Sequence, residues 1–257
     1  MRPKIAVLTK TCALMAGALI AVSASAQTAD EIIAKNLEAR GGKDKIQSTQ
    51  AVRITGKMTM GPGMEAPFTM EWKNPNRVRV EFTVGGQTGV QAFDGTTAWM
   101  HMPFMGKAEP ETMPAEQTAD MEQQADFAGP LVDYQAKGHQ VALVGKRDVE
   151  GTEVYDLLIT LKNGDVMHEL IDAETFLTIQ QERRAKQGDQ EIDVETSLGS
   201  YKEVGGLVLP HSIQSKMKGA QGPAQAMTID AYDFAAQIDD ARFAFPKPAE
   251  PAAPKPQ

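Results

Sequence analysis

Methionine is the residue type whose number and spacing in this chain most suggest a chemical role. Nine of the fourteen methionines lie between residues 58 and 121. The pairs Met58/Met60 and Met100/Met102 are each two residues apart, so in an extended strand both members share one face. Flexible, polarizable thioethers suit an ordinary core or a surface that accepts apolar chains of variable shape. They are also soft ligands, so a Cu(I) site is a third hypothesis.

The other chemically able side chains form no recognisable constellation. No two histidines stand at metal-ligand spacing, and there is no His-Glu-x-x-His, Gly-x-Ser-x-Gly or glycine-rich phosphate loop. His101 lies between Met100 and Met102 and therefore points to the opposite strand face, which weakens the copper hypothesis. We predict no enzyme, no catalytic residue, no metal ligand and no cofactor. The four histidines are His101, His139, His168 and His211.

The first 26 residues have the pattern of a cleavable export signal. Basic residues at positions 2, 4 and 10 precede an apolar stretch from 11 to 22, and Ala24-Ser25-Ala26 predicts cleavage before Gln27. The apolar stretch is too short for a confident membrane span, and no second long one follows. Cys12 is the only cysteine and lies inside this signal, so the mature chain would have no thiol and no disulfide. The net charge of −8 argues against nucleic acid as a partner.

The elements that must position these residues begin with one helix. Thr28 or Asp30 can cap its start, and Gly41-Gly42 interrupts or ends it. After residue 50 the hydrophobic period changes to two, which is typical of antiparallel strands with one buried face. Turn residues such as Asn74-Pro75-Asn76 and Asn163-Gly164 separate the strands.

A mid-chain segment, residues 115–137, breaks the alternation and predicts a helix interrupted at Gly129-Pro130. Strands resume at about 141–147, and two long ones are expected at 190–203 and 207–218. The fold class expected is mainly β (α+β), with about eleven strands, an N-terminal helix and this mid-chain helical segment. We expect one domain over residues 27–245, followed by a disordered Pro-rich tail at 246–257.

Three local motifs carry a resemblance to a known family. They are the strand–turn–strand 72–79 (WKNPNRVR), the segment 93–99 (FDGTTAW) followed by Pro103-Phe104, and the segment 240–246 (DARFAFP). In order and approximate spacing they resemble LolA, the periplasmic carrier of outer-membrane lipoproteins, and its relatives. The resemblance implies a strongly curved antiparallel sheet, an incomplete β-barrel, whose helices close a hydrophobic cavity. It also implies that the last motif forms a closing strand.

One departure from the family pattern concerns its function. The carrier has an arginine just before the proline of the first motif, and this chain has Asn74 there. Arg77 and Arg79 are close in sequence, but their parity puts them on the polar face. The family's lipoprotein-transfer role is therefore not carried over to this residue, and the chain is identified as a divergent member.

The function expected is that of a periplasmic, non-enzymatic carrier of lipid or lipoprotein acyl chains, with inner- or outer-membrane transport proteins as possible delivery partners. Alternatives are a periplasmic Met-rich copper-binding protein and an envelope structural or regulatory partner. Trp99 has the opposite parity to Met100 and is expected to anchor its turn instead. The expected cavity-lining residues are Met58, Met60, Phe68, Met70, Trp72, Val80, Phe82, Met100 and Met102.

Overall fold

The computed structural model describes residues 27–61, 64–187, 190–219 and 225–246. The predicted export signal, and the predicted tail beyond Pro246, lie outside the described residues, so both stay predictions. Among the described helices, none has the length and apolarity needed to cross a membrane.

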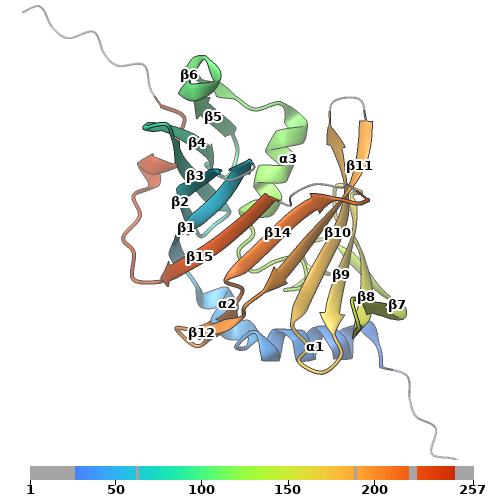
Figure 1. Ribbon diagram of the computed structural model, residues 1–257. Coiled ribbons are helices and arrows are strands. Elements are labelled where there is room, and N and C mark those ends of the chain that lie inside the picture. The colour runs from blue at the N-terminus through green and yellow to red at the C-terminus, as the bar shows by residue number, and fades with distance from the viewer. Residues whose placement is uncertain (1–26, 62–63, 188–189, 220–224, 247–257) are drawn as a thin grey trace, which may run out of the picture.

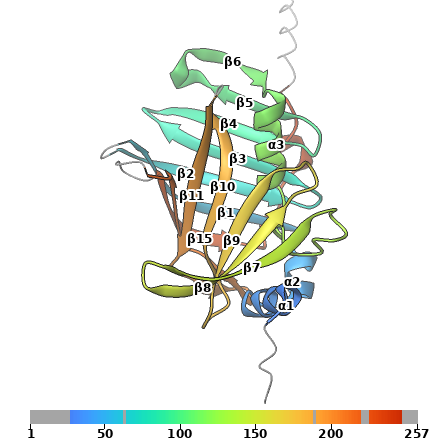
Figure 2. The ribbon, with the colours of Figure 1, turned by 90° about the vertical axis from the view of Figure 1, so that its right-hand side faces the viewer.

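The main element is a single strongly curved antiparallel sheet of thirteen strands (Figures 1 and 2). Its strand order is β6-β5-β4-β3-β2-β1-β15-β14-β11-β10-β9-β8-β7, which leaves β6 and β7 as its two edges. The expected fold class, a mainly β protein with an open, incomplete barrel, is confirmed. The two halves of the sheet meet at the β1–β15 pair and face each other across a concave interior.

The first half is a meander that runs from the middle of the sheet to one edge. Its strands are β1 (Ala51–Gly61), β2 (Met64–Lys73), β3 (Arg77–Val84), β4 (Gln87–Phe93), β5 (Ala98–Met102) and β6 (Lys107–Thr112), with a 3-10 turn at Pro103–Met105. The alternation in the sequence missed β6, whose Lys-Ala-Glu-Pro-Glu-Thr has no apolar period and contains Pro110, a residue confined to edge positions.

The second half begins at the other edge and returns to β1. Its strands are β7 (Gln140–Val149), β8 (Thr152–Thr160), β9 (Val166–Asp172), β10 (Thr178–Gln187), β11 (Gln190–Gly199), β14 (Ser212–Met217) and β15 (Gln225–Asp233). A separate hairpin joins β12 (Lys202–Val204) to β13 (Leu207–Leu209).

Two expected long strands are therefore each divided into two, which accounts for two of the strands beyond the expected eleven. Ser200 has a φ of 52°, in the left-handed region, and breaks the extended backbone between β11 and β12. Pro210 lies between β13 and β14, where it cannot donate a ladder hydrogen bond.

The N-terminal helix is divided as expected into α1 (Ala29–Ala39) and α2 (Lys43–Ser48). Thr28 caps α1 in a reciprocal capping box with Glu31. Gly41 and Gly42 have φ values of 109° and 97°, a conformation that other residues rarely adopt, and this separates the two helices.

The mid-chain helix is shorter than expected. Helix α3 (Ala115–Gln124) ends before the predicted interruption at Gly129-Pro130, and a series of turns follows from 126 to 138. These turns still bury their apolar side chains, because Leu131 and Val132 are each only 1% exposed. The turns are held by side chains: Lys137 binds Asp126 and donates to the Gly129 carbonyl at 2.8 Å.

Two apolar clusters fill the concave side. In the second half of the sheet, α1 and α2 cover the inner face of β8 and β9, with Ile32, Leu37 and Ile46 against Leu157 and Ile159. In the first half, the inner face of β1–β5 forms the other cluster. Phe127 contacts both clusters, so the two cores meet at the turn that follows α3.

The outer face of β1–β5 is covered by the C-terminal segment after β15. The expected closing strand at 240–246 is not formed; Asp240–Arg242 is a 3-10 turn, and Phe243 beyond it is completely buried. The Trp99 indole nitrogen donates to the Phe243 carbonyl at 2.8 Å. Trp99 therefore holds the C-terminal segment, and its expected role as an anchor of its own turn is corrected.

A buried carboxylate fixes this segment to the sheet. Glu71 is 1% exposed and receives hydrogen bonds from Arg242 Nε at 2.6 Å and Arg53 Nε at 3.0 Å. Arg242 also reaches Glu81 at 3.1 Å, and Arg79 donates to the Arg242 carbonyl at 2.7 Å. Because Glu71 is buried, its charge depends on both arginines.

A second buried carboxylate lies beneath α1. Glu169 Oε1 accepts a hydrogen bond from the Thr178 hydroxyl at 2.8 Å, while Oε2 has no hydrogen-bond partner within the described residues. The Asn36 side chain, completely buried on α1, donates to the Phe176 carbonyl at 2.8 Å. Burial raises the pKa of Glu169, and the Thr178 hydrogen bond and the charge of Arg40 oppose this only in part.

We predict that Glu71→Gln lowers the free energy of unfolding by about 2–3 kcal/mol. The effect should be smaller than for a fully buried ion pair, because Arg53 and Arg242 are partly exposed to solvent. Urea denaturation at pH 7 measures this. The control Glu153→Gln removes an exposed pair with Lys146 and should change stability by no more than about 0.5 kcal/mol. Equal effects of the two variants would contradict the role given to Glu71.

We predict that Glu169→Gln stabilises the protein at neutral pH. Burial raises the pKa of the Glu169 carboxyl in the folded protein above its value in the unfolded chain, about 4.3. The neutral carboxyl, which stabilises the fold, is therefore fully present below about pH 4.3 and is lost as the pH rises through the folded pKa. The variant should therefore gain about 1–2 kcal/mol over wild type near pH 7–8, and little near pH 4.

The matched control for this pH dependence is Glu174→Gln, at an exposed turn position after β9. The difference in unfolding free energy from wild type should stay near zero for this variant across the whole pH series. If the gain of Glu169→Gln were constant with pH, or absent, burial of an ionisable Glu169 would not be the cause.

Candidate functional site

The inner face of β1–β5 is the most continuous apolar surface in the described structure. Antiparallel register aligns its side chains in rows that run across the strands. One row crosses all five strands near their middle, and the next lies two residues away. The rows are Ile54, Met70, Val80, Gln91 and Met100, then Val52, Trp72, Val78, Phe93 and Ala98.

The expected cavity-lining residues lie on this face, with one exception. Phe68, Val80, Phe82 and Met102 are buried in the cluster; Met58, Met70, Trp72 and Met100 pack against it and are partly exposed. The side chain of Met60 lies outside the described part. That these residues line a ligand cavity stays a prediction, because in this arrangement the space between them is filled by their neighbours and by α3.

Methionine is the most frequent residue type in the cluster and the residues packed against it, which the sequence only partly indicated. Seven of the fourteen methionines belong to it or pack against it, and three of these come from segments outside the two predicted pairs and Met70. Met227 stands directly opposite Met58 in the β1–β15 register. Such a surface can repack around different apolar shapes with little strain, because methionine has many accessible rotamers. The seven are Met58, Met70, Met100, Met102, Met113, Met121 and Met227.

Helix α3 covers this apolar face, yet it is itself a polar helix. Its sequence, AEQTADMEQQ, contributes one buried side chain, Met121, followed by Ala125 just beyond the helix end. Its side chains also make polar contacts with the second half of the sheet. Asp120 binds Arg183 of β10 at 2.7 Å, and Gln123 donates to Asp165 at 3.2 Å. The helix therefore bridges from the first half of the sheet to the second.

Cavities lie along the side of α3 that faces the second half of the sheet. One, of about 930 Å³, lies between α3 and strands β9–β11 and has a strongly charged lining. Another, of about 740 Å³, lies at the C-terminal end of α3. Both are lined by Gln123, Leu161 and Asn163, so they meet beside the helix. Together they form a groove that separates α3 from half of the sheet.

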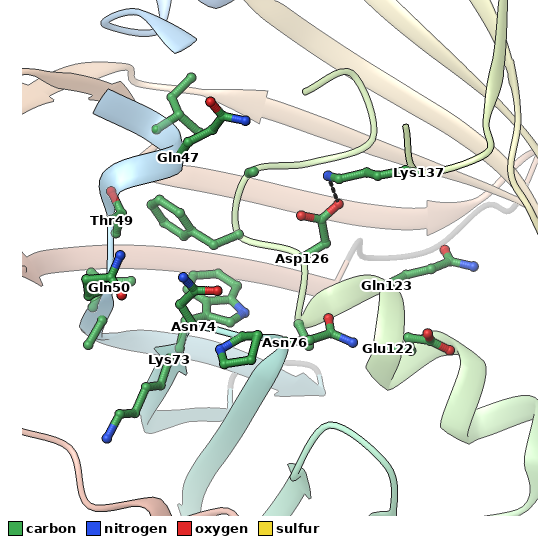
Figure 3. A pocket seen from close by; sticks show the side chains of 18 of the residues that line it. Gln47, Thr49, Gln50, Lys73, Asn74, Asn76, Glu122, Gln123, Asp126 and Lys137 are labelled. Atoms are coloured by element: carbon green, nitrogen blue, oxygen red, sulfur yellow. Dashed lines mark hydrogen bonds and ion pairs between the residues drawn. The ribbon is translucent and has the colours of Figure 1, made fainter. Parts of the chain in front are cut away.

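Figure 3 shows the 740 Å³ cavity, whose lining includes two aromatic side chains, Trp72 and Phe127. Trp72 and Phe127 pack edge to face, 5.6 Å between ring centroids, and both lie between the cavity and the cluster. The Trp72 indole N–H donates to the Gln124 carbonyl at 2.5 Å, so strand β2 is tied to the end of α3. Of the expected lining residues, only Trp72 lines this cavity.

Asn74 lies in the wall of the same cavity, in the turn between β2 and β3. Its backbone N–H donates to the Gln50 carbonyl at 2.8 Å, which fixes the turn against the segment after α2. Arg77 and Arg79 point the other way, as their parity predicts; they bind Asp240 and Glu81 on the outer face. Neither side chain lines the cavity beside Asn74.

The described residues give little support to a metal centre. They contain no group of three or more His, Cys, Asp or Glu side chains arranged to hold an ion. His101 lies on the outer face, as predicted, and its ring nitrogen contacts the Ala108 carbonyl at 2.9 Å, away from Met100 and Met102. His139, at the rim of the 740 Å³ cavity, has a lowered pKa because of burial and of the nearby Lys137 charge.

Comparison with known proteins shows what the fold resembles. No protein-family model and no curated protein sequence matches the chain. A LolA superfamily protein from Nitrosomonas europaea superposes with a TM-score of 0.57 at 14% identity, covering 85% of this chain and 98% of that one. A DUF1329 family protein from Desulfovibrio piger gives 0.58 at 12% identity, covering 81% and 95%.

A putative outer membrane lipoprotein-sorting protein domain from Vibrio parahaemolyticus gives a TM-score of 0.56 at 11% identity, covering 82% of this chain and 94% of the other. At such low identity these likenesses establish the fold alone. The resemblance drawn from the three motifs is therefore confirmed at the level of fold: the chain has a LolA-like fold, as a divergent member would.

Sequence reasoning missed the residues that place α3. Asp120 meets Arg183, and Gln123 meets Asp165, only because β10 and the β8–β9 turn face the helix across the interior. Both contacts join segments more than 40 residues apart. The sequence of α3 itself could have indicated its role as a cover. A single methionine in an otherwise polar helix indicates a cover with a small apolar contact, where an integral core helix would have a continuous apolar stripe.

We predict that Met121→Ala loosens α3 selectively. Truncating its one buried side chain should cost about 2 kcal/mol of docking free energy, so amide exchange in residues 115–125 should become about thirtyfold faster, while β2 and β3 keep their protection. Hydrogen exchange with mass spectrometry measures this. Met105→Ala, at a site 68% exposed, is the matched control. Uniform acceleration across the sheet would show that α3 is part of the core and not a separable cover.

Proposed function

We propose that this chain, with its LolA-like fold, is a non-enzymatic carrier that binds acyl chains of a lipid or lipoprotein in the periplasm. The observation that carries the proposal is the Met-rich inner face of β1–β5 covered by a polar helix with one buried side chain. A permanent core would be closed by an apolar element, whereas this cover leaves a groove beside it.

The energies favour displacement of α3 by a ligand. Burial of Met121, the half-exposed Asp120–Arg183 pair and the rim hydrogen bonds together hold the helix by about 3–5 kcal/mol. An acyl chain that buries about sixteen methylenes gains about 13 kcal/mol, which leaves about 8–10 kcal/mol after α3 is displaced and corresponds to micromolar or tighter binding. The gain exceeds the docking energy, so an acyl ligand can pay for opening and still bind.

The compartment is part of the proposal and is supported by the export pattern of residues 1–26. The proposal also includes delivery of the bound lipid or lipoprotein to inner- or outer-membrane transport proteins. The sorting role that names the Vibrio parahaemolyticus domain supports a similar task for this chain. A carrier needs no catalytic group.

Binding of a fluorescent acyl probe, with native mass spectrometry of the protein purified from its own compartment, tests the proposal. We expect copurified lipid or a micromolar or tighter probe site. Met70→Gln, in the middle of the apolar row, should weaken probe binding at least about tenfold, because a polar amide would then lie in the acyl path.

The control is Met105→Gln, the same exchange at an exposed site in the Pro103–Met105 turn, which should leave probe affinity unchanged. A protein that is empty and that ignores every acyl probe would overturn the proposal. So would equal binding by wild type and Met70→Gln, since the probe would then be elsewhere.

A further inference from the structure

The wall chemistry of the 740 Å³ cavity suggests what its ligand carries outside the apolar interior. Six carboxamide side chains from four separate segments line this one cavity. They come from α2 and the loop after it, the β2–β3 turn, the end of α3 and the β8–β9 turn. The six are Gln47, Gln50, Asn74, Asn76, Gln123 and Asn163.

Several of these amides are already engaged, which identifies the free ones. Gln47 binds Asp133, and both Gln123 and Asn163 bind Asp165. The Gln50 amide nitrogen donates to the Ser48 carbonyl at 3.2 Å, which leaves its carboxamide oxygen without a partner among the described residues. Among the described residues, nothing forms a hydrogen bond with the carboxamides of Asn74 and Asn76. Figure 3 shows Asn74 beside Gln50 on one wall, across the cavity from Gln123 on α3.

Positive and negative charges around the cavity nearly balance, so the cavity has no strong excess of positive charge. Lys137 is bound to Asp126, and Lys73 points away and binds Asp240 and the Ile238 carbonyl. The two remaining charged side chains, Lys162 and Glu122, are exposed and opposite in sign. No arginine is among the lining residues. Phosphate sites usually supply arginine or a helix N-terminus, whereas α3 presents its C-terminal end here.

The position of the cavity connects it to the acyl site. Trp72 and Phe127 separate it from the Met-rich cluster, and Phe127 also packs edge to face on Phe234, 6.4 Å between centroids. A ligand with its chain on the inner face of β1–β5 would pass these rings and leave its polar end among the amides. The cavity, about 740 Å³, has room for one or two sugar units or a short peptide.

We propose that this cavity is a head-group subsite that selects an uncharged polar group with both hydrogen-bond donors and acceptors, such as sugar hydroxyls or amides. The inference rests on the proposed function, because it assigns the outer end of the same acyl ligand. Carboxamides both donate and accept hydrogen bonds, which matches hydroxyls and amides, whereas they bring no positive charge to compensate a phosphate for its lost water. Asn74 contacts the head group with its whole carboxamide, and Gln50 contacts it through the carboxamide oxygen that its bond to Ser48 leaves available.

The test compares probes that share one twelve-carbon chain and differ only in head group, each used below its micellar concentration. Dodecyl maltoside carries sugar hydroxyls, N-dodecanoyl glycinamide carries amides, and dodecyl phosphate carries an anion. Isothermal titration should give at least about tenfold tighter binding for the neutral heads than for the phosphate. The ratio of the dissociation constants for the maltoside and the glycinamide distinguishes a glycolipid from an acylated peptide as the source of the head group.

Variants separate the subsite from the acyl site. Asn74→Ala and Gln50→Ala should each reduce the neutral-head advantage to less than about threefold and leave the phosphate probe unchanged. Asn74→Arg should reverse the preference toward the phosphate. Gln214→Ala, at an exposed position on the outer face of β14, is the control and should change nothing.

Each result decides a different claim. Equal affinity for all three probes, or tightest binding of the phosphate by wild type, would overturn the head-group subsite and leave the carrier function standing. Failure of every probe to bind would overturn the carrier function and the subsite with it. Tenfold selectivity that survives Asn74→Ala and Gln50→Ala together would place the selection elsewhere and overturn this assignment.

Discussion

The constraint on which the rest of the structure depends is that the two edges of the sheet are consecutive in the chain. Strand β6 is one edge and β7 the other, and the remaining strands of the thirteen-stranded sheet lie between them in space. The sheet curves but does not close, so the connection from β6 to β7 must cross its concave side. Helix α3 and the turns after it are this connection. A cover over the interior is therefore a consequence of strand order, and its sequence decides how firmly it is held.

Two residue sets on opposite faces of the same strands then have different tasks. The outer face of β1–β5 is fixed by the ion pairs around Glu71 and by the C-terminal segment, which makes this half of the sheet a rigid wall. The inner face carries methionines that can repack without moving the wall. The groove beside α3 includes an amide-lined cavity at Asn74, which Trp72 and Phe127 separate from this adaptable surface. Rigid wall, adaptable lining and weakly held cover are together the properties that an acyl carrier needs.

The sequence predicted the parts of this arrangement that depend on local periodicity. The parity of Met70, Trp72, Val80 and Phe82 placed them on one face, and the break at Gly41-Gly42 and the capping by Thr28 were confirmed. It failed where distant segments decide the outcome. The division of the long strands at Ser200 and Pro210, the end of α3 at Gln124 and the contact of Trp99 with Phe243 depend on tertiary packing. The ion pair of Asp120 with Arg183 was invisible for the same reason.

The most direct test of the central claim, that α3 must move for an acyl chain to bind, uses the absence of cysteine from residues 27–257. Asp120→Cys and Arg183→Cys place two thiols across the groove, where a short, reducible bifunctional crosslinker can join them. The account predicts that the crosslinked protein fails to take up a fluorescent acyl probe and regains uptake when the crosslink is reduced. Undiminished uptake by the crosslinked protein would contradict it.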